Sequence, residues 1–147
     1  MKALLKISAL LLPWLVLPGA NCWAACTLDV QSVLLGSYDA ITANAVDGTG
    51  TIRVQCTPAA DYTVSLSAGQ GSYATREMHA GASVLHYNLY LAATRVAVWG
   101  NGNSGTMNLS ANGSDTWHTV YGRIEAGQNT VRAGGSYSDQ VLVTVDF

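Results

Sequence analysis

The last twelve residues of the chain, Ser136 to Phe147, constrain the fold more than any other stretch. Their apolar side chains, among them Val141, Val143 and Val145, fall on alternate positions, and the positions between them are mostly polar. This two-residue period, rich in β-branched residues, is typical of a strand with one buried face. An exposed apolar edge invites pairing with other chains, so we expect an earlier strand of this chain or a partner to cover it.

Similar short alternating segments recur along the chain, and no segment keeps the 3.6-residue apolar period of a helix for long. The dipeptides Asp47-Gly48, Asn101-Gly102 and Asn112-Gly113 are typical of turns. The pattern predicts an all-β fold, an antiparallel β-sandwich. A seven-stranded immunoglobulin-like sandwich has one strand more than this chain, so an incomplete sheet is compatible with the count. Six main strands are predicted, near residues 27–35, 51–56, 61–67, 83–91, 116–125 and 136–147.

The first segment, residues 1–24, is predicted to be a secretory signal peptide. Two lysines, at positions 2 and 6, precede an apolar run from Ile7 to Leu17. The tripeptide Cys22-Trp23-Ala24 then places small residues at the two positions that signal peptidase reads. Cleavage after Ala24 leaves a mature domain of residues 25–147.

Two alternatives to this processing remain open. Cleavage after Ala20 would leave a few more residues on the mature chain. An uncleaved segment would act as a signal anchor, although its apolar run is short for a membrane span. No later stretch is apolar enough to cross a bilayer, so the domain is not expected to be embedded in a membrane after removal of the signal.

Signal removal also determines which cysteines remain. Cys22 leaves with the signal peptide, so Cys26 and Cys56 are the only possible pair in the mature domain. In an oxidising compartment we expect them to form a disulfide, the alternative being two free buried thiols. The bond would close a loop of roughly 30 residues and stabilise the fold by about 3–4 kcal/mol on chain-entropy grounds.

The charge pattern gives no support to nucleic-acid binding. The chain carries seven basic and nine acidic side chains, and its only lysines, Lys2 and Lys6, lie in the predicted signal peptide. Recognition of a phosphate backbone needs clustered positive charge. The mature domain has no such cluster, and nucleic acid is not an expected partner.

No motif indicates catalysis, a metal or a cofactor. His79, His86 and His118 match no zinc-binding spacing, and the two cysteines are already expected to pair. The glycine-rich stretch 69–74 lacks the following helix that would give it a nucleotide-binding role, and no GxSxG nucleophile motif occurs. The sequence therefore predicts a protein that is not an enzyme and holds no metal or cofactor.

Aromatic residues are abundant for so small a domain. Core filling is their expected use, with surface recognition as the alternative, and Trp99 beside a glycine-rich loop is the first candidate for exposure. The group comprises Tyr62, Tyr87, Trp99, Trp117 and Tyr121.

Several local motifs also occur in a definite order. Together they closely resemble the spore coat protein U domain family, which includes pilin subunits of archaic, Csu-type chaperone–usher pili. The resemblance covers nearly the whole mature chain, and the motifs at its C-terminus are the most specific. The motifs are Cys26 to Cys56, Arg76-Glu77-Met78, Leu85 to Tyr90, Val98 to Gly102, Val120 to Ile124, Ala126 to Asn129, and Gly135 to Asp139 with the alternating tail to Phe147.

This resemblance implies an immunoglobulin-like fold that lacks its last strand. In such pilins a periplasmic chaperone supplies a strand beside the C-terminal strand, and a neighbouring subunit replaces it in the fibre. The terminal carboxylate of Phe147 is then an anchor for the chaperone, and an outer-membrane usher is a further partner. The resemblance implies that the groove for the partner strand is lined by Tyr137, Val141, Val143, Val145 and Phe147.

The sequence departs from this family pattern before its first cysteine. Shaft subunits carry a donor segment of about 10–15 residues there, long enough for one strand. After cleavage at Ala24, only Ala25 precedes Cys26. We expect such a subunit to accept a strand but not to donate one, which fits a terminal position in a fibre or a coat protein that does not polymerise.

The leading hypothesis is a secreted, non-enzymatic structural subunit of a chaperone–usher pilus. It would pass through the periplasm to the cell surface and serve in attachment or biofilm. The alternative is a self-complete secreted spore-coat or matrix protein that does not polymerise, in which an internal segment such as Thr106 to Leu109 covers the open edge. A small carbohydrate-acting enzyme or lectin is the third possibility, and no motif supports it.

Overall fold

A computed structural model describes residues 23–129, 131–132 and 134–147, and these consist of strands and loops. The predicted signal peptide lies almost entirely outside the described residues. No described segment is a helix of the length and apolarity that a membrane span requires. The strands are β1 (Ala25–Leu34), β2 (Val46–Leu66), β3 (Arg76–Ala80), β4 (Ser83–Tyr90), β5 (Leu109–Ile124) and β6 (Val143–Asp146).

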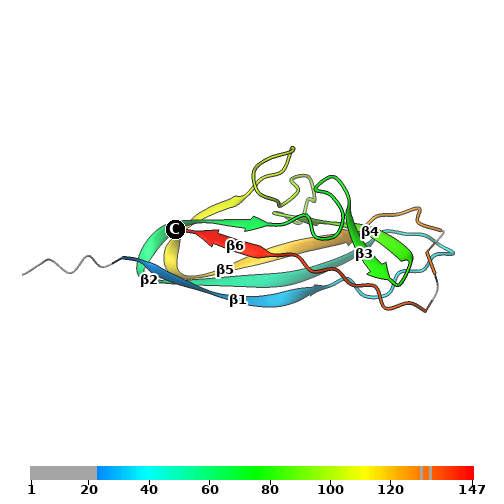
Figure 1. Ribbon diagram of the computed structural model, residues 1–147, viewed down its shortest axis with the longest axis horizontal. Coiled ribbons are helices and arrows are strands. Elements are labelled where there is room, and N and C mark those ends of the chain that lie inside the picture. The colour runs from blue at the N-terminus through cyan, green and yellow to red at the C-terminus, as the bar shows by residue number, and fades with distance from the viewer. Residues whose placement is uncertain (1–22, 130, 133) are drawn as a thin grey trace, which may run out of the picture.

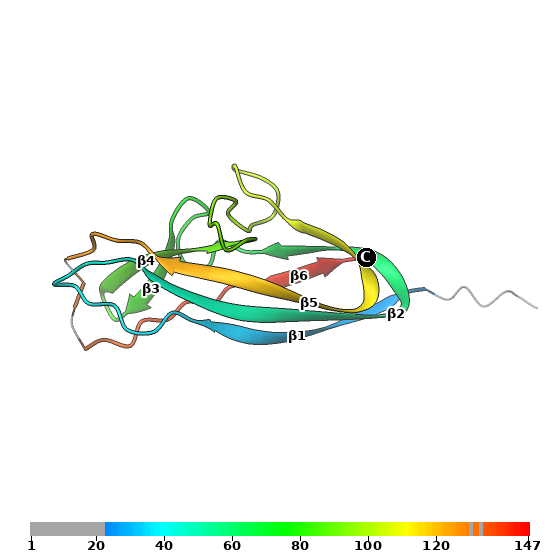
Figure 2. The same cartoon turned by 180° about the vertical axis from the view of Figure 1, so that it is seen from behind.

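The six strands form one curled antiparallel sheet, which confirms the all-β prediction. Their order is β1-β2-β5-β4-β3, and β6 pairs with β2. The two long strands β2 and β5 run together as a ribbon that bends back on itself, so the sheet becomes a half-barrel (Figures 1 and 2). The bend coincides with a break in the β2–β5 register between Gln55 and Ala60.

This bent ribbon explains why two predicted turns are wrong. Asp47-Gly48 lies within β2, opposite Arg123 and Gly122, and Asn112-Gly113 lies within β5 at the bend. A side chain at position 48 would clash with the Leu34 carbonyl oxygen, so glycine there permits the close approach of the end of β1. The predicted strands 51–56 and 61–67 are correspondingly the two arms of β2.

The C-terminal stretch is less regular than predicted. Only Val143–Asp146 pairs continuously with a neighbour, the second arm of β2. Before it, Ser138 exchanges backbone hydrogen bonds with His79 of β3, at 2.9 and 3.2 Å. The predicted strand 136–147 therefore changes neighbour halfway. The strand β3 was missed in the sequence, where its segment resembles a polar connection.

The core fills the inside of the curled sheet with the alternate residues that the strand periods predict. Trp99 is 1% exposed and donates its indole N–H to the Val64 carbonyl at 3.0 Å. Trp117, by contrast, is exposed on the outer face, where the guanidinium carbon of Arg53 lies 5.0 Å from the centroid of its ring. The buried apolar side chains include Ile52, Val54, Tyr62, Val64, Leu66, Leu85, Tyr87, Leu89, Trp99, Val120 and Ile124.

Within residues 23–129, 131–132 and 134–147, Arg76 is the one charged side chain that lies fully buried in this core. It donates from Nη1 to Asn88 Oδ1 at 2.6 Å, and from Nη2 to the carbonyl oxygens of Ser67 and Trp99 at 2.8 and 2.7 Å. Burial lowers the pKa of this guanidinium, but not enough to neutralise it in a protein. The guanidinium of Arg76 therefore connects three segments by hydrogen bonds: the end of β2, strand β4 and the turn that begins at Trp99.

His118 is expected to make the stability of the fold depend on pH. Its Nε2 lies 2.8 Å from the Tyr62 hydroxyl on the inner side of the sheet, and burial lowers the pKa of this imidazole. The folded state thus favours the neutral imidazole. The contribution of His118 to stability is complete above its pKa in the unfolded chain, about 6.5, and is lost as the pH falls below that value. We expect the free energy of unfolding, measured in urea, to decrease between pH 7 and pH 5.

The matched variant for this prediction is His118→Gln, which retains a polar side chain beside the Tyr62 hydroxyl but does not titrate. The decrease between pH 7 and pH 5 is expected to be smaller in this variant. An identical decrease in both proteins would show that other groups cause it.

Candidate partner-strand groove

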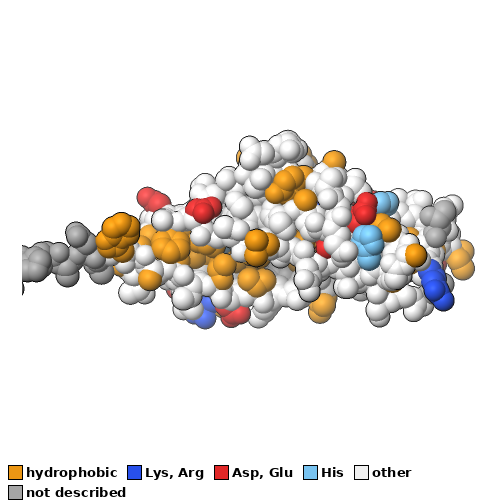
Figure 3. Space-filling model, viewed as in Figure 1, with side chains coloured by type: hydrophobic (Ala, Val, Ile, Leu, Met, Phe, Trp, Pro, Cys, Tyr) orange, Lys and Arg blue, Asp and Glu red, His pale blue; other side chains and the backbone are white. Residues whose placement is uncertain are grey.

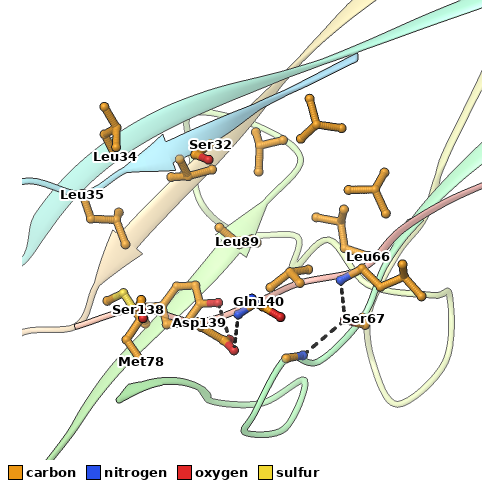
Figure 4. A pocket seen from close by; sticks show the side chains of 18 of the residues that line it. Ser32, Leu34, Leu35, Leu66, Ser67, Met78, Leu89, Ser138, Asp139 and Gln140 are labelled. Atoms are coloured by element: carbon orange, nitrogen blue, oxygen red, sulfur yellow. Dashed lines mark hydrogen bonds between the residues drawn. The ribbon is translucent and has the colours of Figure 1, made fainter. Parts of the chain in front are cut away.

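A groove separates β1 from β6. In the described part of the chain, each of these strands pairs only with β2, β1 with its first arm and β6 with its second. Because β2 bends back, β1 and β6 face one another across the open side of the half-barrel (Figure 1). A cavity of about 840 Å³ lies between them, lined by residues 30–35 on one side and 137–143 on the other (Figure 4).

The groove is apolar, although it is open to solvent. Leu28 and Val30 lie opposite Val54 and Ile52 on the core-facing side of the sheet, yet they are 39% and 49% exposed. Hydrophobic side chains form a row along this face in Figure 3. Side chains with the alternation of a buried strand are therefore left without cover, which is typical of an interaction surface.

The backbone of β1 also directs unpaired groups into the groove. The Cα atoms of Cys26 and Cys56 are 4.1 Å apart, the short spacing of an antiparallel pair that is not hydrogen-bonded. Such pairs alternate with hydrogen-bonded pairs along a regular register, so Leu28 and Val30 share the geometry of Cys26. The N–H and C=O groups of these residues consequently point away from β2.

Strand β6 presents the same arrangement on the opposite wall. Ser67 N–H donates to the Leu142 carbonyl at 2.9 Å, which marks a hydrogen-bonded pair at this position. The next pair along, Leu66 with Val143, is therefore not hydrogen-bonded, and neither is the pair of Val64 with Val145. Val143 and Val145 turn both their side chains and their backbone groups toward the groove.

Hydrogen bonds around Asp139 fix the inner end of the β6 wall (Figure 4). One carboxylate oxygen accepts from the backbone N–H groups of Gln70 and Gln140, at 3.1 and 2.7 Å. The other accepts from the Tyr87 hydroxyl at 2.7 Å. Burial, together with this bond, raises the pKa of Tyr87, so the phenol stays protonated and remains a donor.

The inner end of the β1 wall is formed by a bulge. The register with β2 shifts between Gln31 and Leu34, and this shift turns Val33 and Leu35 toward the core. A Cβ atom at position 122 would lie 2.8 Å from both Val33 and Leu35. Because Gly122 has no side chain, these two residues can pack onto the sheet. Val33 and Leu35 thus close the β1 side of the cavity at this end.

Of the five residues predicted to line the groove, three border its cavity. Tyr137, Val141 and Val143 line the cavity. Val145 lies further along β6 and packs against the core, and Phe147 follows the strand with 60% of its surface exposed. The sequence analysis predicted a strand near residues 27–35 but did not assign it to the groove.

The two cysteines lie opposite each other and form the expected disulfide, which fastens β1 to the first arm of β2 at the bend. The histidines do not form a centre of any kind: within residues 23–129, 131–132 and 134–147, no three potential metal ligands gather. The walls of the groove offer apolar side chains and backbone hydrogen-bonding groups.

Comparison with known proteins now identifies the family. The model of the Spore Coat Protein U domain matches residues 14–144. The chain belongs to the spore coat protein U domain family. A curated relative, Protein U from Myxococcus xanthus, is 32% identical to it over an alignment that covers 87% of this chain and 80% of that protein.

A solved structure shows the same fold as this spore coat U domain. It is the crystal structure of the CsuC–CsuE chaperone–tip adhesion subunit pre-assembly complex, from archaic chaperone–usher Csu pili of Acinetobacter baumannii. The TM-score is 0.58 at 20% identity, over 85% of this chain. The match spans 40% of the chain in that structure, so the likeness concerns one part of it. It confirms the predicted immunoglobulin-like, pilin-type fold.

Proposed function

We propose that this domain is a secreted, non-enzymatic structural subunit of a chaperone–usher pilus, and that it accepts a strand from another chain in the groove between β1 and β6. The observation that carries the proposal is the pair of facing walls, each with apolar side chains and unpaired backbone groups at the same residues. Family membership and the fold shared with a pilus-subunit complex support it.

An extended strand fits this groove better than a small molecule does. The cavity volume of about 840 Å³ lies within the range of small-molecule sites, so size alone does not discriminate. However, two strand edges that face one another offer hydrogen-bonding groups at the two-residue repeat of a polypeptide. A strand between them satisfies both edges and buries alternate apolar side chains, as in β-augmentation.

The groove can accept such a strand in either direction. The arrows of β1 and β6 point in opposite directions in Figure 1, so an inserted strand is antiparallel to one wall and parallel to the other. On the antiparallel side, core-facing residues of the inserted strand hydrogen-bond with the wall residues directly opposite them. On the parallel side, outward-facing residues of the inserted strand hydrogen-bond with the core-facing residues of the wall. A chaperone strand and the strand of a neighbouring subunit therefore both fit, whichever direction each takes.

The position of the subunit in the fibre depends on the mature N-terminus. If signal peptidase cleaves after Ala24, only Ala25 precedes β1's first cysteine, and the domain has no segment to donate. We therefore place it at a fibre end, exported through an usher to the cell surface, with a role in attachment or biofilm. Because Lys2 and Lys6 are the only lysines, an amine-reactive label on the exported protein marks its N-terminus alone and reports the cleavage site by mass spectrometry.

Strand acceptance is tested with the mature domain and a synthetic peptide of alternating apolar and polar residues. We expect the peptide to raise the melting temperature of residues 25–147. Val143→Asp is expected to weaken peptide binding by about tenfold or more, because the inserted strand would bury the new charge without a partner. The measurements are thermal unfolding and isothermal titration calorimetry.

The matched control is Thr144→Asp, which adds the same charge to the adjacent residue of β6 on its outward face. This variant should bind the peptide as the unmodified domain does. If no peptide raises the melting temperature, or if both variants bind equally well, strand acceptance in this groove is wrong.

The second candidate function is a self-complete coat or matrix protein of the kind that gives the family its name. The segment expected to complete the sheet in that case, Thr106 to Leu109, does not do so. Leu109 pairs with Val64 through β5, whereas β6 occupies the other edge of β2. Strong protection of the β6 amides from hydrogen exchange in the isolated domain would favour this second function over the pilin.

A further inference from the structure

The two Asn-Gly dipeptides of the chain lie in different structural settings. Asn101-Gly102 is part of the loop 101–105, whose residues are all exposed, and Gly102 has a left-handed φ of 82°. Asn112-Gly113 lies within β5 and is paired with β2. Because the dipeptide is the same, a difference in reactivity between the two sites has to come from the fold.

The loop arranges the groups of Asn101 and Gly102 for reaction with each other. Asn101 Oδ1 accepts the Asn103 N–H at 3.0 Å, which turns the side-chain amide toward the residues that follow it and polarises its carbonyl. None of the hydrogen bonds among the described residues involves the Gly102 N–H. Glycine also has no side chain to obstruct this nitrogen. The Gly102 nitrogen can therefore approach Asn101 Cγ.

In β5 the equivalent groups are held by the sheet. The backbone groups of Val64 point toward β5 because they do not bond β6, and the two-residue alternation gives Ala60 and Gly113 the same hydrogen-bonded geometry. The Gly113 nitrogen is thus engaged in the ladder. The Asn112 side chain is engaged as well, since its Nδ2 donates to Asp61 Oδ1 at 2.8 Å.

From this contrast we infer that Asn101 is a site of spontaneous deamidation, and that the sheet protects Asn112 from the same reaction. The Gly102 nitrogen gives its proton to solvent base and forms a bond to Asn101 Cγ, and the side-chain nitrogen leaves as ammonia. Water then opens the resulting succinimide ring to aspartate or isoaspartate. The reaction needs no reagent other than water, and either product carries a negative charge that asparagine lacks.

The modification should change the surface charge and leave the sheet intact. Gly100 N–H donates to the Met107 carbonyl at 2.8 Å, and Met107 N–H donates to the Val98 carbonyl at 2.9 Å. These bonds hold both ends of the loop without involving Asn101. Acidic side chains already outnumber basic ones in this chain, so the exported protein becomes still more acidic with time.

The test uses the exported, disulfide-bonded protein, incubated in mildly alkaline buffer and analysed by peptide mass spectrometry. Cleavage after Leu109 separates the two dipeptides. In the folded protein we expect Asn101 to be converted at least about tenfold faster than Asn112, because the sheet must open locally before the Gly113 nitrogen can react. In concentrated urea with the disulfide reduced, neither site is structured and the two rates should become similar.

Two variants assign the reaction to its residue. Asn101→Gln should abolish the fast conversion, because the longer side chain has to close a larger ring. Asn112→Gln, the matched control, should leave the fast conversion unchanged. Both positions are exposed, and urea unfolding verifies that each variant is folded.

Three results would overturn the inference. They are conversion of Asn101 no faster than that of Asn112 in the folded protein, a fast conversion that survives Asn101→Gln, and a rate difference that persists in urea. The last of these would show that flanking residues, and not the fold, set the rates. Strand acceptance in the groove does not depend on any of these outcomes.

Discussion

Replacing Arg76 with methionine is expected to lower the free energy of unfolding by roughly 3–5 kcal/mol. The methionine fills a similar volume but donates no hydrogen bond. It therefore leaves Asn88 Oδ1 and the carbonyl oxygens of Ser67 and Trp99 without the donors that Arg76 provides. Domains of this size are stable by only about 5–15 kcal/mol, so the variant should unfold at much lower urea concentration.

The matched control is Arg53→Met. Arg53 also lies in a strand, but it forms its ion pair with Asp115 on the solvent-exposed outer face, at 2.6 Å. Water screens such a pair, and its loss should change stability little. If Arg76→Met and Arg53→Met have the same urea midpoint, the buried arginine does not hold the three segments together.

Removing the disulfide is the second change with a large expected effect. In the double variant Cys26→Ser/Cys56→Ser, the unfolded chain regains the entropy of a loop with a sequence separation of 30, which costs about 3–4 kcal/mol of stability. The effect on β1 should exceed that on the rest of the sheet, because β2 is its one neighbour among the described strands and most of its residues are exposed. Urea unfolding measures the total effect, and hydrogen exchange measures the loss of protection in β1.

The same double variant also distinguishes a loss of overall stability from a loss of peptide binding in the groove. Because β1 is one wall, the double variant should also bind the alternating peptide more weakly than the disulfide-bonded domain does at equal folded fraction. Chemical reduction of the unmodified domain provides the control, since it breaks the bond without changing a residue. Peptide affinity that is unaffected by both treatments would exclude β1 as a wall of the binding site.

Much of the fold was predictable from the sequence because the inward positions of its strands are apolar and alternate. Ile52, Val54 and Leu89 follow this rule and lie in the core. The rule fails for β3, whose inward position is held by the buried Arg76. A charged residue at this inward position breaks the apolar period of the strand. No local sequence pattern distinguishes a buried arginine in a strand from an exposed arginine in a loop.

The missed features of the groove have a similar physical origin. Asp47-Gly48 and Asn112-Gly113 have the composition of turns, but long-range pairing between β2 and β5 overrides this local preference. The alternation of the C-terminal valines predicted a half-buried strand whose edge needs a cover, and the family resemblance implied that this strand lines a groove. Neither indicated the β1 wall, because a one-sided alternation such as that of Leu28 and Val30 does not reveal which strand, if any, covers it. Only the bend in the ribbon places the two walls opposite each other.

The ribbon of β2 and β5 also has a consequence for the order of folding. Its pairs join residues 46–64 to residues 109–124, so a long stretch of chain must be brought together before either arm can form. Topologies with such high contact order fold on the millisecond-to-second scale. During that time both arms present bare strand edges to any neighbour in the compartment. A chaperone that binds the partly folded sheet would therefore influence how the chain reaches its native topology, as well as cover the finished groove.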